Sequence, residues 1–82
     1  MKNIILDFEN MHGRENTHVY LAQMLGFPEY YGKNLDALYD CLTELADCSV
    51  TFIGDAHGYG RRVLEVFRDA AQTNPGLILE IQ

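Results

Sequence analysis

The chain has 82 residues, 48% of them hydrophobic, and carries a formal net charge of −6 from 12 acidic and 6 basic side chains. This length predicts one domain, residues 1–82, with a core that is only just sufficient, and the apolar content excludes a disordered chain. The charge disfavours direct binding of nucleic acid, because phosphate contacts require a basic surface. An acidic protein of this size instead favours a basic protein as partner.

Targeting and membrane signals are not found in the sequence. No apolar run approaches the roughly 18 residues that a membrane span needs. The opening apolar segment is interrupted at Asp7, too early for a signal peptide. We therefore expect a cytoplasmic protein with no membrane association. In that reducing compartment Cys41 and Cys48 should be free thiols.

The first third of the chain predicts a strand followed by a helix. Residues 3–8 (NIILDF) have the continuous aliphatic character of a buried strand, with both faces covered. A polar loop should follow, with Asn16 or Thr17 capping a helix that runs to Leu25, and Gly26 is a natural stop. The expected core positions of this helix are Val19 or Tyr20, Leu21, Met24 and Leu25.

The stretch from Phe27 to Asp47 joins an aromatic loop to the most regular helix pattern in the chain. Asn34 is the expected N-cap. Leucines recur at helical spacing on one side, at Leu35, Leu38, Leu42 and Leu45. Four carboxylates gather on the other side, at Asp36, Asp40, Glu44 and Asp47. Like charges four residues apart destabilise a helix by a few tenths of a kcal/mol. The arc therefore indicates a face that binds something outside the helix.

The remaining chain alternates strand, helix and strand. Residues 49–53 are β-branched and aromatic, Gly54 to Gly60 is a glycine-rich loop with no room for a helix, Arg61 to Thr73 is helical, and residues 77–81 form a last strand. Short apolar strands alternating with helices predict an α/β fold with a small three-stranded parallel sheet packed against three main helices.

The three histidines are the first candidates for a metal or catalytic site. His12, His18 and His57 lack metal-ligand spacing and are expected to face solvent; no metal or cofactor is expected.

Asp36 and Asp40 could act as a general acid and base, although a chain this short has little left to build a cleft around them. A protein-recognition face is the opposing interpretation, because exposed tyrosines are typical of binding hot spots. One of the adjacent Tyr30 and Tyr31 should then lie in the core.

The segment YYGKNLDALYDCL, from Tyr30 to Leu42, resembles the barstar family of intracellular ribonuclease inhibitors, as does PEYYG, from Pro28 to Gly32, which overlaps its start. A second block, VLEVFRDA from Val63 to Ala70, is similar to the family's late helix. The resemblance implies a non-enzymatic inhibitor that blocks the active site of a guanine-preferring secreted ribonuclease. It also implies that Asp40 occupies the pocket for the substrate phosphate. The implied partner-binding residues are Tyr30, Gly32, Asn34, Asp36, Tyr39, Asp40, Thr43 and Asp69.

Three departures from the family pattern fall on the presumed contact face. Tyr39 stands where the prototype has Trp, Glu44-Leu45 replaces Gly-Trp, and Lys33 replaces an acid. We therefore add Glu44 and Leu45 to the binding residues and expect a 1:1 complex with a basic extracellular or toxin ribonuclease other than barnase itself. The alternative is a binding module for another basic protein, without nuclease inhibition.

Overall fold

The computed structural model describes residues 1–82. Along the chain follow β1 (Lys2–Asp7), the short 3₁₀ turn η1 (Phe8–Asn10), α1 (Arg14–Leu25), α2 (Leu35–Thr43), β2 (Cys48–Ile53), α3 (Tyr59–Thr73) and β3 (Leu77–Ile81). The predicted α/β class, with three helices and a three-stranded parallel sheet, is confirmed.

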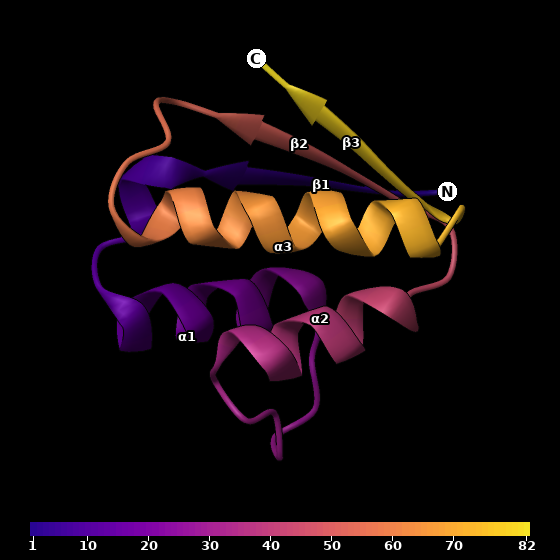
Figure 1. Cartoon of the computed structure of the whole chain (residues 1–82), viewed down its shortest axis with the longest axis horizontal. Coiled ribbons are helices and arrows are strands. Elements are labelled where there is room, and N and C mark those ends of the chain that lie inside the picture. Colours follow the sequence, from indigo (N-terminus) through magenta and orange to yellow (C-terminus); the bar gives the residue numbers. More distant parts are fainter.

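The sheet has the order β1-β2-β3, and both pairings are parallel. All three helices lie on one side of it: α3 lies next to the sheet, α1 contacts β1, and α2 packs against α3 (Figure 1). Because the strand order is sequential, two crossovers of the same hand bring their helices to the same face. The prediction that the first strand is covered on both faces is therefore wrong, and Ile5 on the open face is 57% exposed.

The core lies between the sheet and α3. Phe52 near the end of β2 stacks on Phe8 at 5.1 Å between ring centroids and meets Phe67 of α3 edge-on at 5.0 Å. Leu21 and Leu25 of α1 and Leu38 and Leu42 of α2 are buried within the same cluster. A continuous core thus fixes α2, the helix that carries the predicted binding residues.

Helix α1 differs in detail from the prediction. It begins at Arg14, and its N-cap is Gly13, which provides no side-chain cap. Thr17 is instead fully buried and donates its hydroxyl to the carbonyl of Gly13. Of the alternatives Val19 and Tyr20, the half-buried Tyr20 packs against the core and Val19 is 36% exposed. Met24, also expected in the core, is 39% exposed. The helix ends as predicted, with Gly26 in the left-handed conformation (φ 71°).

Other boundaries move by a few residues. Phe8 belongs to η1, in which the Asp7 carboxylate accepts the N–H of Glu9. Helix α3 begins at Tyr59, inside the predicted glycine-rich loop. Helix α2 ends at Thr43, so Glu44 is its C-cap and Asp47 lies outside it. No helix combines the length and apolar character that crossing a membrane requires.

Candidate protein-binding site

The loop before α2 turns sharply and presents one tyrosine to solvent. The N–H of Tyr31 donates to the carbonyl of Pro28 at 3.0 Å, which closes the turn. Tyr30 at its tip is 89% exposed, whereas Tyr31 is 6% exposed and belongs to the core. The prediction that one of the two lies in the core is confirmed. An exposed aromatic ring beside a firmly anchored one is suited to contacting a partner at low entropic cost.

Tyr31 is anchored by a buried hydrogen-bond chain. Its hydroxyl lies 2.6 Å from Nδ1 of His18, and Nε2 of His18 lies 2.7 Å from the hydroxyl of Tyr59. The chain joins the loop to α1 and α3. The prediction that His18 faces solvent is wrong, because its side chain is fully buried. The spacing of His18 to Leu21 and Leu25, three and seven residues, was a signal for the core face of α1.

Burial keeps the side chains of this hydrogen-bond chain, His18 and the two tyrosines, neutral. It lowers the pKa of His18, and the nearby positive charge of Arg14 lowers it further. Burial also raises the pKa of Tyr31 far above its ordinary value, with smaller contributions from Cys41 and Tyr59. A neutral imidazole donates from one nitrogen and accepts at the other, so it can bridge the two hydroxyls. The loop is thereby held in place without any charge.

The start of α2 is fixed by its cap. Oδ1 of Asn34 accepts the N–H of Ala37 at 2.7 Å, and Nδ2 of Asn34 donates to the carbonyl of Gly32 at 3.3 Å. A Cβ on Gly32 would lie 3.2 Å from the Cβ of Ala37, so a larger residue would push the loop away from the helix. Lys33 between them adopts a left-handed conformation, with φ 53°. Asn34 is therefore first of all a structural cap.

Asp36 and Asp40 lie four residues apart on the solvent side of α2. Both carboxylates are exposed and neither forms an ion pair within the chain, whereas Leu38 and Leu42 on the opposite side are fully buried. Asp36 is in the first turn, where a negative charge favours the helix dipole. The predicted arc of four helical acids is thus corrected to two on the helix, with Glu44 at its cap.

Three predicted residues meet at the far end of α2. Tyr30, Glu44 and Leu45 line a mostly apolar hollow of about 240 Å³ between the loop and the helix end. Thr43 at this end donates its hydroxyl to the carbonyl of Asp40 at 2.9 Å. The loop and the helix therefore form one continuous surface from Tyr30 to Leu45.

Tyr39 of α2 and Asp69 of α3 both lie near the C-terminal end of α3. The hydroxyl of Tyr39 is 3.1 Å from Oγ1 of Thr73. Asp69, which is exposed, precedes Thr73 by four residues and so shares its side of α3. No side-chain hydrogen bond or ion pair links Asp69 to α2.

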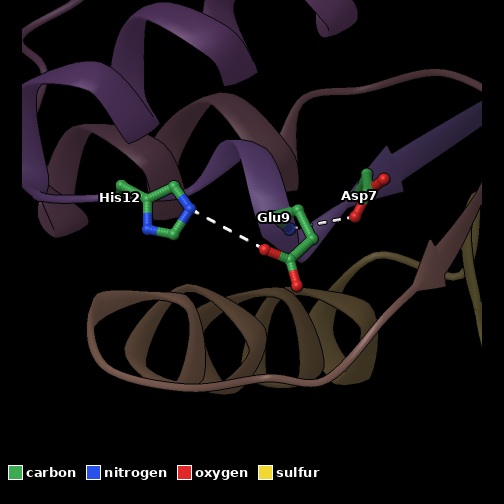
Figure 2. Close-up of polar contacts among 3 residues, drawn as sticks. All are labelled: Asp7, Glu9 and His12. Carbon is green, nitrogen blue, oxygen red and sulfur yellow. Dashed lines mark hydrogen bonds and ion pairs between the residues drawn. The ribbon is translucent and has the colours of Figure 1, made fainter.

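The other two histidines lie at the surface near the end of β1. Figure 2 shows His12 beside Glu9, whose N–H is held by Asp7; Nε2 of His12 lies 3.8 Å from the Glu9 carboxylate, and both side chains are mostly exposed. The ring of His57 lies 5.7 Å from that of His12. No group of three or more His, Cys, Asp or Glu residues in the chain could hold a metal ion.

Nucleophilic chemistry finds little support in these residues. Both cysteines are free. Burial raises the pKa of the Cys41 thiol, and the carboxylates of Glu44 and Asp40 raise it further, which disfavours the reactive thiolate. Asp36 lines a polar groove, but Asp40 lines none of the hollows in the surface, so the two carboxylates do not share a cleft.

The chain is similar to a known protein family and to a known protein. The family described as Barstar (barnase inhibitor) matches residues 1–77. A protein of Bacillus subtilis (strain 168), named "Putative ribonuclease inhibitor YrdF", is 40% identical over an alignment that covers 88% of each chain. The family match runs from β1 through the aromatic loop, α2, β2 and α3 to the first residue of β3.

Proposed function

The chain belongs to the barstar family, and on that basis we propose that it inhibits a basic bacterial ribonuclease by covering the active site with α2 and the loop before it. The nuclease is a barnase-like or toxin enzyme, bound in a 1:1 complex in the cytoplasm. The proposal gives the chain no catalytic step of its own. The binding residues are those of the sequence prediction: Tyr30, Gly32, Asn34, Asp36, Tyr39, Asp40, Thr43, Glu44, Leu45 and Asp69.

The observation that carries the proposal is the pair Asp36 and Asp40 on a helix that the core holds rigid. Both carboxylates are exposed and free of any cation in the chain. A ribonuclease active site must offer cationic groups to the substrate phosphate, and carboxylates fit the same groups. The exposed ring of Tyr30 stands at the edge of the same surface and adds apolar contact area.

Asp40 provides the direct test. We expect Asp40→Asn to weaken inhibition at least about 30-fold, because removing one partner of a desolvated charge pair costs about 2–5 kcal/mol. The measurement is the inhibition constant against a panel of purified basic bacterial ribonucleases, barnase included, with an RNA substrate. The matched control is Asp55→Asn, which removes one exposed carboxylate from the loop after β2 and should leave inhibition unchanged.

Two outcomes would contradict the proposal in different ways. Equal inhibition by wild type and Asp40→Asn would remove the assigned mechanism. Tight binding of wild type to a basic nuclease without any loss of RNA cleavage would instead favour the alternative of a binding module. Circular dichroism melting of both variants shows whether the fold is intact, which we expect because both side chains are exposed.

A further inference from the structure

Basic residues gather around the start of α2, in a chain that is acidic overall. Arg14 is the first residue of α1, Lys33 directly precedes the Asn34 cap, and Arg62 lies in the first turn of α3. They line two adjoining grooves that share Arg14, one of about 310 Å³ with Arg62 and one of about 360 Å³ with Lys33. These three residues, half of the six basic residues, form what we call the basic rim.

The basic rim has no partner within the chain. The one ion pair that the chain forms joins His12 to Glu9, so no carboxylate lies within 4.0 Å of Arg14, Lys33 or Arg62. None of the three side chains donates a hydrogen bond to the protein, in contrast to Arg61, which donates to the carbonyl of Ala56. Asp36 lines the groove between the two arginines without pairing to either. All three cations are therefore available to an external group.

The position of the basic rim is unexpected for a surface that docks onto a basic enzyme. It adjoins Asn34 and Asp36, which belong to the proposed contact surface. Cations at this place would repel a nuclease that is basic throughout, and like charges brought together across an interface are strongly unfavourable. The arrangement is favourable only if the partner carries negative charge opposite the basic rim.

We propose that the basic rim binds acidic side chains at the border of the nuclease active site and thereby selects the cognate nuclease. This inference rests on the proposed function and adds the chemistry of the partner's surface. Guanidinium groups match carboxylates in a two-pronged geometry that ammonium groups cannot reproduce. The acidic helix would then drive association, while the basic rim rejects basic nucleases that lack the acidic border.

Charge reversal tests the proposal because the general and the local effects have opposite signs. Arg14→Glu and Arg62→Glu each make the inhibitor two charges more negative, which by itself should speed association with a basic nuclease. If the basic rim contacts carboxylates, each variant should nevertheless inhibit at least 10-fold more weakly. The measurement is the inhibition constant at pH 8, against the nuclease of the panel that wild type inhibits best.

Lys2→Glu is the matched control. It changes the charge by the same amount at the start of β1, at the end of the molecule opposite to the beginnings of α1 and α3 (Figure 1). We expect inhibition by this variant to be equal to that of wild type or slightly stronger. If the two arginine variants behave like Lys2→Glu, the basic rim has no acidic partner and the proposal is overturned while the inhibitor function stands.

Two further measurements separate the remaining explanations. If wild type inhibits no member of the panel, the proposed function fails and the selection of a nuclease fails with it. A fluorescently labelled single-stranded RNA should not bind wild type; binding that Arg14→Glu and Arg62→Glu abolish would assign the basic rim to nucleic acid instead. Both variants should melt like wild type, since both side chains are exposed and a carboxylate at the start of α1 favours the helix dipole.

Discussion

His18 is the residue on which the position of the aromatic loop depends. In its neutral form it donates to the hydroxyl of one of Tyr31 and Tyr59 and accepts from the other. A protonated ring would have to donate from both nitrogens in a buried site, with no carboxylate bonded to it and Arg14 nearby. Protonation of this one side chain therefore opposes folding.

We expect the free energy of unfolding to fall as the pH is lowered through about 6.5. The pKa of His18 is lowered in the folded protein, so the unfolded chain binds the proton first and stability is complete above the unfolded pKa. It declines below about 6.5, by at most about 1.4 kcal/mol per pH unit, until the folded pKa is reached. Urea melts between pH 5.5 and 8 measure the effect, above the range in which ordinary carboxylates titrate.

Substitution of the buried His18 and of an exposed histidine shows which side chain causes this pH dependence. His18→Gln should be less stable at pH 8 but should lose most of the decline toward pH 5.5. His57→Gln, an exposed histidine in the loop after β2, should keep the wild-type response. A decline that survives in His18→Gln would show that other groups cause it.

At the scale of the elements, α2 is held at both ends by asparagines. Asn34 caps its start, and Nδ2 of Asn74, just after α3, donates at 2.9 Å to the carbonyls of both Leu42 and Leu45 at its end. Oδ1 of Asn74 accepts the N–H of Gly76 at 2.9 Å, which directs the chain into β3. One side chain thus fixes the end of α2 and the start of β3.

Asn74→Ala should destabilise the protein by about 2–3 kcal/mol, because it leaves two helix-end carbonyls without their donor. Inhibition should weaken in addition, since Leu45 and the hollow beside Tyr30 lose their support. Thermal melting and the inhibition constant measure the two effects. Asn16→Ala, at an exposed asparagine of α1, is the control and should change neither by more than a small amount. An unchanged melting temperature in Asn74→Ala would contradict the role given to this side chain.

The same elements show what the sequence could predict. Local signals located α2 and its Asn34 cap, the stop at Gly26 and the strands, because capping and periodicity depend on neighbouring residues. The end of α2 was predicted four residues too late. Its last carbonyls bond to Asn74, some 30 residues away, and the N–H groups of Glu44 and Leu45 reach back only three residues. Contacts of such long range leave no trace in periodicity.

For the candidate site as well, the sequence could predict some features and not others. Asp36 and Asp40 could be identified from the resemblance of a continuous segment, and the structure places both on one exposed face. The His18 bridge and the basic rim could not be identified from the sequence, because each joins side chains from three separate segments of the chain. Only the packing of α1 and α3 around the start of α2 brings those groups together.

At the scale of the whole molecule, the one-sided architecture directs the binding surface away from the sheet. All helices lie on one face, and α2 is on the far side of α3 from the strands (Figure 1). The acids of α2 are thus presented at an outer surface of the molecule, where their field reaches a basic partner before contact. Net charge and shape together predict that association is steered electrostatically.

We therefore expect association with the inhibited nuclease to slow at least 10-fold between about 0.05 M and 0.5 M NaCl, because salt shortens the range of charge interactions from more than 10 Å to a few Å. Stopped-flow mixing measures the association rate constant.

The double variant Asp36→Asn/Asp40→Asn should associate more slowly at low salt and show a shallower salt dependence. A double variant with the same net charge, Asp55→Asn/Glu80→Gln, should retain most of it, since these acids lie outside α2. Equal slopes for the two would mean that overall charge, and not the face of α2, steers the encounter. A flat response in wild type would mean that the acidic face is not the surface that meets the nuclease.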